Sequence, residues 1–291
     1  MAGHVLVGAD GSDSSLEAVA VAAHEAQARG LGLRIVSAFT WPMLKLRHAS
    51  AAGDTAEPAM RRRAEETVAT AVERARAEEP DLAPVEGEVV TGEALTVLAT
   101  RSRDAALVVV GSRGLGAFSG LLIGSVAVHL AAHAECPVLV VRGRERPEGP
   151  VAVAVDGSDA AKAAVEEAFD EAARRGSGLL AVHVWNTWSG TGPAGPGAPA
   201  PLWFDTDKLR EDSEATLSGA LAAGRGRHPD VEVEARSVHG RVRPSLIETS
   251  QDASLLVVGA RGRGGFQGLL LGSVSQALLH HADCPVLVTR R

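Results

Sequence analysis

The chain has 291 residues, of which 45% are hydrophobic and 22% are charged, and its formal net charge is −7. This length and balance indicate a globular protein of about two domains with enough apolar residues for real cores. The acidic charge argues against nucleic-acid binding, and aromatic residues, at 3% with no Tyr, are too few for base-stacking platforms.

Neither a targeting segment nor a membrane span is visible in the sequence. The N-terminus enters an apolar segment at once, without the basic stretch, apolar core and cleavage site of a secretory signal. The longest apolar run, 121–132, is interrupted by Gly124, Ser125 and His129 and is shorter than the roughly 20 residues that a membrane-spanning helix needs. We therefore expect a cytoplasmic protein that binds neither membrane nor nucleic acid.

The chain contains one pattern twice, at a spacing of about half its length. VLVGADGSDSSLEAV, from Val5, matches VAVAVDGSDAAKAAV, from Val151, and the closing segments HAECPVLVVR and HADCPVLVTR also match. A repeat of this length indicates a duplicated domain rather than a solenoid. The charged segment 143–150, which contains Pro and Gly, is the expected linker between domains over 1–142 and 151–291.

The first half alternates expected strands and helices. Residues 5–9 are too apolar for a half-exposed strand, so we place them in the centre of a parallel sheet. Asp10 to Asp13 form a turn and an N-cap, apolar residues at helical spacing predict a helix over 14–29, and Gly30 ends it. The elements expected next are strands over 33–39, 85–91, 105–110 and 137–141, helices over 58–79, 94–103 and 124–134, and loops over 41–57 and 111–123.

The second half repeats this order. Its strands are expected near 151–155, 179–185, 231–238, 253–258 and 285–289. Its loop after strand two, 186–201, is longer and rich in Gly and Pro. Strand–helix alternation with short connections predicts an α/β fold with an open parallel sheet and helices on both faces. Strand 85–91 alternates polar and apolar residues, which favours a place nearer the edge of the sheet.

A glycine-containing segment follows the fourth strand of each half. In the first half, an apolar strand runs into Gly111 and Gly114, and Gly124-Ser125 then opens the next helix. The second half repeats this spacing with Gly259, Gly262, Gly272 and Ser273. Glycines let the backbone come close to a ligand, and the start of a helix offers unpaired N–H groups and the positive end of the helix dipole. Each segment therefore predicts a phosphate cradle for a nucleotide, with a tight turn that binds nothing as the alternative.

In sheets of this type, ligands bind beyond the carboxyl ends of the strands, where the strand order reverses. Asp10 follows the first strand and Gly111 the fourth, so both belong at that edge. The G-x-x-G-x9-G-S motif after an apolar strand, the Asp after strand one and the closing CPVLVV strand resemble the universal stress protein family. The doubled pattern resembles the tandem form of that family and covers nearly the whole of both halves.

The resemblance implies two doubly wound, Rossmann-like parallel sheets of five strands each, in the order 3-2-1-4-5 and related by a pseudo-two-fold axis. It also implies one ATP in each half, with or without Mg²⁺. A carboxylate after strand one lies near the nucleoside, backbone at the end of strand two contacts adenine, and the glycines with the Gly-Ser pair hold the phosphates. The positions that match are Asp10, Ala38, Gly111, Gly114, Gly124 and Ser125 in the first half and Asp156, Val184, Gly259, Gly262, Gly272 and Ser273 in the second. A phosphate contact from Arg113 and Arg261 inside the loops is our own hypothesis, and solvated loop charges are the alternative.

Other roles compete at several of these positions. Asp10 and Asp156 are also suitable helix N-caps, although Ser12 or Asp13 could cap the first helix instead. Ser125 and Ser273 can cap their helices and bind phosphate together, because both roles use the same helix end.

Cysteine and histidine positions favour structural roles. Cys136 and Cys284 precede the closing strands at equivalent places in two separate cores, which favours small buried hydrophobes over a disulfide. His133 and His281 lie nearby without Cys, His or Asp at metal-ligand spacing, so we expect no metal site.

No motif for fast catalysis is present in the sequence. The chain lacks a G-x-x-x-x-G-K-[ST] loop, which supplies the lysine and metal-binding hydroxyl of P-loop ATPases, and it lacks a G-x-S-x-G elbow. Together with this absence, the resemblance to the universal stress protein family implies an ATP-binding regulator or sensor of the stress response rather than a fast enzyme. The alternatives are a slow ATPase or nucleotide-processing enzyme, and a structural partner protein with empty pockets.

The closing strand of each half predicts how the halves assemble. Residues 137–141 and 285–289 are short and apolar, and an exposed strand edge of that kind invites pairing. Members of the family that this chain resembles dimerise through this strand. We expect the two halves to pair with each other through strand five, and a homodimer of whole chains is a further expectation.

Overall fold

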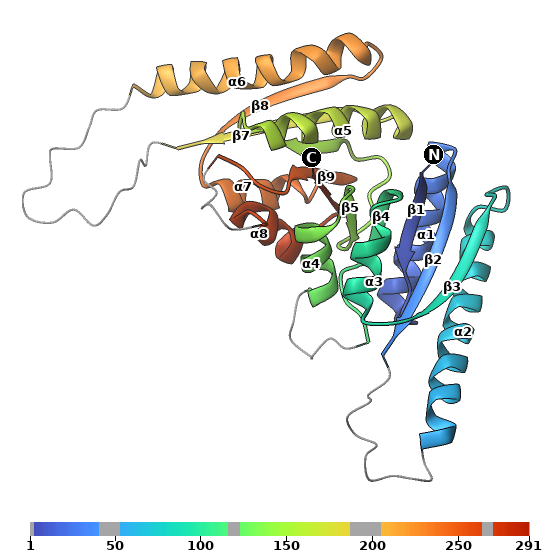
Figure 1. Cartoon of the computed structure of the whole chain (residues 1–291). Coiled ribbons are helices and arrows are strands. Elements are labelled where there is room, and N and C mark those ends of the chain that lie inside the picture. The colour runs from blue at the N-terminus through green and yellow to red at the C-terminus, as the bar shows by residue number, and fades with distance from the viewer. Residues whose placement is uncertain (1–2, 41–52, 116–122, 187–204, 264–269, 291) are drawn as a thin grey trace, which may run out of the picture.

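The computed structural model describes residues 3–40, 53–115, 123–186, 205–263 and 270–290 (Figure 1). The strands within these ranges are β1 (His4–Gly8), β2 (Gly32–Phe39), β3 (Val85–Thr91), β4 (Ala105–Gly111), β5 (Val138–Val141), β6 (Val151–Ala154), β7 (Leu179–Trp185), β8 (Val233–His239), β9 (Leu255–Gly259) and β10 (Val286–Thr289). They form one ten-stranded sheet of order β3-β2-β1-β4-β5-β10-β9-β6-β7-β8. Each half therefore contains the order expected from the sequence, and strand five of each half lies at the centre of the whole sheet.

Helices cover both faces of the sheet (Figure 1). They are α1 (Asp13–Arg29), α2 (Gly53–Glu78), α3 (Ala94–Arg101), α4 (Ser125–His133), α5 (Asp159–Arg175), α6 (Thr206–Arg227), α7 (Val242–Thr249) and α8 (Ser273–His281). One apolar core joins the sheet to α1, α2, α5 and α6, and a second core joins the opposite face to α3, α4, α7 and α8. This arrangement confirms the predicted doubly wound α/β fold.

Strand β1 is apolar at consecutive positions because both of its faces are buried. Val5 and Val7 are fully buried in one core, and Leu6 is fully buried in the other, because successive side chains of a strand point to opposite faces. β1 pairs in parallel with β2 and with β4, so neither edge is free. The predicted edge position of β3 is likewise confirmed.

Local signals begin and end the first helix. The Ser12 side chain accepts a hydrogen bond from the backbone N–H of Ser15, 3.2 Å away, and Gly30 ends the helix in the left-handed region with φ of 63°. Ser12, rather than Asp10, is thus the N-cap. The next helix differs from the expectation, since α2 begins at Gly53 within the expected loop 41–57; the part of that loop over 41–52 lies outside the described residues.

The two halves join through strand five, as the sequence predicted. β5 and β10 pair antiparallel, with Leu139 opposite Leu287. The two five-stranded sheets are therefore continuous, and their carboxyl edges point in opposite directions at the junction. The homodimer of whole chains stays a prediction.

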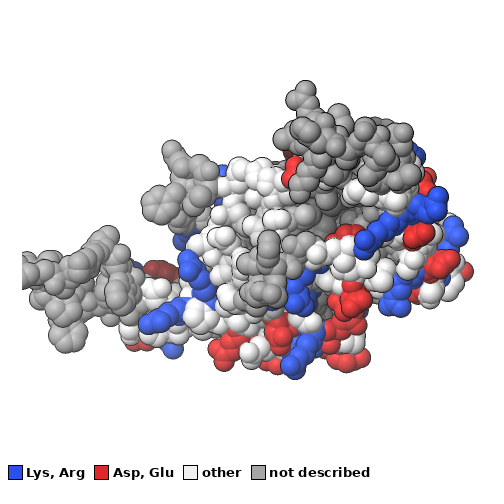
Figure 2. All heavy atoms as spheres, turned by 90° about the horizontal axis from the view of Figure 1, so that it is seen from below, with Lys and Arg blue, Asp and Glu red and all other residues white. Residues whose placement is uncertain are grey.

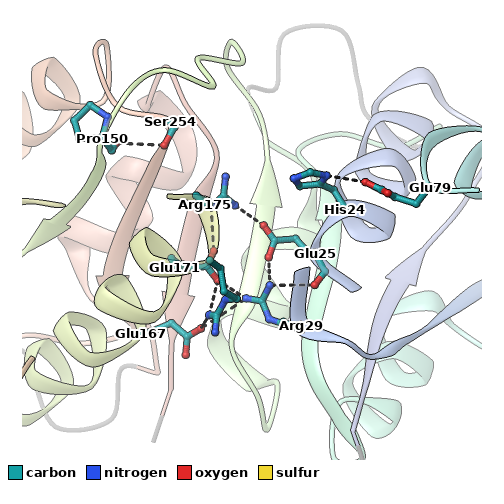
Figure 3. Close-up of polar contacts among 10 residues, drawn as sticks. His24, Glu25, Arg29, Glu79, Pro150, Glu167, Glu171, Arg175 and Ser254 are labelled. Atoms are coloured by element: carbon teal, nitrogen blue, oxygen red, sulfur yellow. Dashed lines mark hydrogen bonds and ion pairs between the residues drawn. The ribbon is translucent and has the colours of Figure 1, made fainter. Parts of the chain in front are cut away.

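Polar side chains reinforce this junction. The Arg142 guanidinium donates to the carbonyl oxygens of Leu278 and Leu279 in α8, at 2.9 and 2.6 Å. Arg290 donates in turn to the carbonyl oxygen of Ala132 in α4. Each domain therefore holds the last turn of a helix in the other, and ion pairs between α1 and α5 add a second reciprocal contact (Figure 3).

Cys136 and Cys284 are buried free thiols, as expected, and burial raises the pKa of each to about 12.

Within the described residues, none of the helices has the length and apolar character needed to cross a membrane. On the face seen in Figure 2, positive and negative side chains are interspersed rather than gathered by sign.

Candidate functional site

A cavity lies at the carboxyl ends of β1 and β4 in the first domain. Its volume is about 380 Å³. Its lining includes all seven positions predicted for this half: Asp10, Ala38, Gly111, Arg113, Gly114, Gly124 and Ser125. The fold thus brings together residues from the ends of three strands and the start of α4.

The second domain contains the equivalent cavity, with a volume of about 520 Å³. Its lining includes the seven corresponding positions: Asp156, Val184, Gly259, Arg261, Gly262, Gly272 and Ser273. Every predicted site residue therefore borders one of two cavities that are related by the repeat.

Asp10 connects the end of β1 to the glycine loop. One carboxylate oxygen, Oδ1, accepts from the backbone N–H and the hydroxyl of Ser12, at 3.0 and 2.6 Å. The other, Oδ2, accepts from the backbone N–H of Leu115 at 2.7 Å. Burial raises the pKa of Asp10, but the hydrogen bonds from Ser12 and Leu115 outweigh it and the net pKa is lowered. Asp10 is therefore an ionised carboxylate that organises the cavity floor.

Asp156 repeats this arrangement in the second domain. Its Oδ1 accepts from the backbone N–H of Ser158 at 2.9 Å, and its Oδ2 accepts from the backbone N–H of Arg263 at 2.9 Å. The two aspartates thus accept from backbone N–H groups at equivalent positions, and the first also accepts from the Ser12 hydroxyl. Each ties its glycine loop to the strand at the centre of its domain.

Packing within the chain explains the first two glycines of the motif. A Cβ at Gly111 would collide with the backbone of Ser14 in α1, and a Cβ at Gly114 would collide with Oδ2 of Asp10. The same collisions recur at Gly259 and Gly262. These positions require glycine for the close approach of the loop, whether or not a ligand binds.

The third glycine has no such explanation inside the described part of the chain. Gly124 has φ of −79°, which any residue adopts, and the nearest described atom to a Cβ there would be the Ser112 carbonyl oxygen at 3.6 Å. Gly272 is alike, with φ of −73° and nearest atoms at 3.4 Å. A side chain would fit the backbone at both positions but would fill the cavity at the start of the helix.

Both cavities meet an uncapped helix N-terminus. Gly124 and Gly272 are the N-cap residues of α4 and α8, and neither helix has a side-chain cap. Ser125 and Ser273 are the first helical residues, so the capping role considered for them is wrong. The first N–H groups of these helices are left for a ligand or solvent, together with the positive end of the helix dipole.

Two groups of lining residues escaped the sequence analysis. The first is an apolar wall from the strand ends and the third helix of each domain: Val36, Leu98 and Val110, and Val182, Leu246 and Val258. Leu98 in α3 and Leu246 in α7 occupy equivalent positions of the repeat, and this match could have identified both as lining residues. The second group is Arg243 and Arg263, which line only the second cavity. Among the described residues, no group of three or more His, Cys, Asp or Glu side chains is placed to hold a metal ion.

Comparison with known proteins gives the family. A family model described as the universal stress protein family matches residues 1–142 and, again, 149–290. The chain belongs to the universal stress protein family, in its tandem form. One universal stress protein of Mycobacterium tuberculosis is 37% identical over 98% of this chain and 94% of its own length. A second from that organism is 35% identical over 99% of this chain and 97% of its own.

A solved structure supports the fold. The crystal structure of a universal stress protein from Archaeoglobus fulgidus covers 100% of this chain and 97% of its own, with a TM-score of 0.69 at 20% identity. At that identity the likeness concerns the fold alone.

Proposed function

We propose that this universal stress protein binds two adenine nucleotides, one in each cavity, and that their occupancy is a regulatory signal in the stress response. The observation that carries the proposal is the free space kept at Gly124 and Gly272. Neither backbone conformation nor packing requires glycine there, whereas a phosphate approaching the helix N-terminus does. We assign the two sites to domains over 1–142 and 151–291, with 143–150 as the linker.

The phosphates would bind at the start of α4 and α8. The residues of the first helical turn line each cavity, and Arg113 or Arg261 lines it from the glycine loop. Backbone donors and a guanidinium are the groups that proteins use for phosphate oxygens. ATP is the ligand we expect, because such a cradle gains most from a long, highly charged phosphate chain.

The nucleoside would lie against the apolar wall. Val36 and Leu98 offer a surface for a flat base, and backbone near Ala38 offers hydrogen-bonding groups at the end of β2. Asp10 has further lone pairs on both carboxylate oxygens and is placed to accept from ribose hydroxyls. The second domain provides Val182, Leu246, Val184 and Asp156 in the same places.

Magnesium would enter with the nucleotide. Within the described lining, each cavity contains a single carboxylate, which already accepts hydrogen bonds from the chain. Mg²⁺ prefers several oxygen ligands and usually keeps substrate phosphates and water among them. We therefore assign no protein metal site.

Thermal unfolding with ATP and with adenosine tests this function. A ligand that binds only the folded state raises the midpoint of unfolding, and the rise grows with ligand concentration. We expect ATP at millimolar concentration to raise the midpoint clearly more than adenosine does, because adenosine lacks the phosphates. An equal rise in the midpoint with ATP and with adenosine would contradict phosphate binding at the helix starts. No rise with either ligand would contradict nucleotide binding.

A matched pair of variants tests the role of Gly124. Gly124→Asp places a carboxylate at the N-cap, where Asp favours the helix, but where its charge repels phosphate. Gly124→Asn has nearly the same size and capping ability without the charge. We expect the Asp variant to fold as well as wild type and to lose one site, while the Asn variant loses less affinity. Gly272 allows the same comparison in the second domain.

A further inference from the structure

The two cavities differ in charge although their backbones match. Among described lining residues, the first cavity has one carboxylate, Asp10, and one guanidinium, Arg113, which balance. The second has one carboxylate, Asp156, and three guanidiniums, from Arg243, Arg261 and Arg263, an excess of two positive charges.

The extra arginines replace leucines of the first domain. The repeat aligns Arg263 with Leu115, one residue after the second glycine of the motif, and Arg243 with Leu95, in the first turn of the third helix. Residues 116–122 and 264–269, which continue the two loops outside the described part, contain no charged residue. Lys45 and Arg47 belong to segment 41–52, also outside the described part, so the comparison concerns the described lining.

The positions of these side chains keep them at the cavity. The Arg263 backbone is fixed by its hydrogen bond to Asp156, and its guanidinium lies over Gly157, in the turn after β6. Arg243 is held by α7 on the other side. Both are exposed, and neither forms an ion pair with a described carboxylate. Their charges are therefore available to a ligand.

Charge of this kind discriminates between phosphate chains. ATP carries about two more negative charges than AMP near neutral pH, and a positive excess in a concave site attracts the more charged ligand more strongly. ATP and AMP have the same base and ribose, so contacts to the adenosine part cannot separate the two ligands.

We infer that Arg243 and Arg263 make the second cavity the site that selects nucleoside triphosphate over monophosphate, while the first cavity accepts both with smaller preference. This inference rests on the proposed nucleotide binding at both sites. The chain would then contain one site that responds to the triphosphate level and one that responds to the total adenylate pool.

Single-site proteins test the inference. Gly124→Asp leaves the second site and Gly272→Asp leaves the first, and calorimetric titration of each with ATP and with AMP gives the ratio of the two dissociation constants. We expect this ratio to favour ATP at least about tenfold more strongly at the second site than at the first, and the difference to shrink as salt is raised.

Exchanging the residues between repeats identifies the cause. Arg243→Leu with Arg263→Leu, in the Gly124→Asp protein, is expected to reduce the ATP preference to that of the first site. Leu95→Arg with Leu115→Arg, in the Gly272→Asp protein, is expected to raise it. Arg62→Leu with Arg225→Leu removes the same charge from exposed positions outside both cavities and should leave the ratio unchanged.

The outcomes separate this inference from the proposed function. Equal ratios at the two sites, or exchanges that leave the ratios unchanged, would overturn the assignment to Arg243 and Arg263 while nucleotide binding stands. Absence of ATP and AMP binding in both single-site proteins and in wild type would overturn the proposed function itself. Circular dichroism and thermal unfolding of each variant show that it is folded.

Discussion

Arg29, in the last turn of α1, forms an ion pair with Glu171 of α5 across the junction between the domains (Figure 3). Their counterparts in the repeat, Arg175 and Glu25, form the reciprocal pair. Both glutamates are nearly inaccessible, with 3% exposure for Glu25 and 1% for Glu171. The glutamate of each domain thus pairs with the arginine of the other domain, as pseudo-two-fold symmetry requires.

Replacing Glu171 by Gln is expected to destabilise the protein by about 3 kcal/mol, because Arg29, Arg174 and Arg175 all lose the most deeply buried carboxylate of their cluster. Burial raises the pKa of Glu171, but Arg29, Arg175 and Arg174 outweigh it and the net pKa is lowered from 4.5. The ionised form therefore stabilises the fold above the unfolded pKa, and this contribution is lost as pH falls below 4.5. Urea unfolding of both proteins from pH 7 to pH 2 should show a difference that is constant above about pH 4.5 and shrinks below it.

Glu167, at the edge of the same cluster, is expected to behave in the opposite way. Burial and the neighbouring Glu171 raise its pKa above 4.5, so ionisation of Glu167 costs folding free energy as pH rises through the folded pKa. Glu167→Gln keeps an acceptor for Arg174, which donates to Glu167 at 2.9 Å. The variant should be as stable as wild type at pH 4 and equal or more stable at pH 7. A marked loss at pH 7 would contradict this description of the cluster.

Arg142 is expected to stabilise the junction through the last turn of α8. Arg142→Met removes two charge-assisted hydrogen bonds to carbonyl oxygens and should lower the free energy of unfolding by about 2 kcal/mol. Arg290→Met should act similarly through α4. Thermal and urea unfolding measure the effect, and Arg144→Met, an exposed neighbour, is the control. A loss no greater than that of the control would mean that the helix ends do not need these arginines.

Asp10→Asn is expected to release the glycine loop of the first domain. The amide cannot supply two acceptor oxygens, so either Ser12 or the Leu115 N–H loses its partner. Hydrogen exchange at Leu115 should become faster, and ATP affinity at the first site should fall about tenfold. Asp13→Asn, which removes an exposed carboxylate from the first turn of α1, is the matched control.

The effect of Asp10 on stability should depend on pH. Its folded pKa is lowered from 3.8 by its hydrogen bonds despite burial. The stabilisation is therefore fully present above the unfolded pKa and is lost as pH falls through the lower, folded value. Wild type and Asp10→Asn should converge in stability only below about pH 4, and a constant difference down to pH 2 would contradict the hydrogen-bond network.

The fold was predictable because local signals agreed with one another. Val5, Leu6 and Val7 in succession indicate a strand buried on both faces, and Ser12 and Gly30 mark the ends of the next helix. The positions of the candidate site followed because Asp10 and Gly111 both end strands of a parallel sheet. That rule places residues at one edge without any knowledge of side-chain packing.

The junction was only partly predictable. Pairing of β5 with β10 followed from two apolar edge strands, but Glu25 and Arg29 have the spacing of a solvated helix face. They are buried because α5 of the other domain covers them, which is a tertiary effect. The charge difference between the cavities was visible in the sequence as Leu115 against Arg263, but its meaning required knowing that both positions border the cavities or their loops.

Equilibrium dialysis with radiolabelled ATP is the most direct test of the central claim, since it counts nucleotides bound per chain. We expect two for wild type, one for Gly124→Asp, one for Gly272→Asp and none for the protein with both changes, all four being folded. Failure of wild type to bind ATP at millimolar concentration, or unchanged binding in the doubly substituted protein, would contradict the placement of nucleotides at these two helix starts.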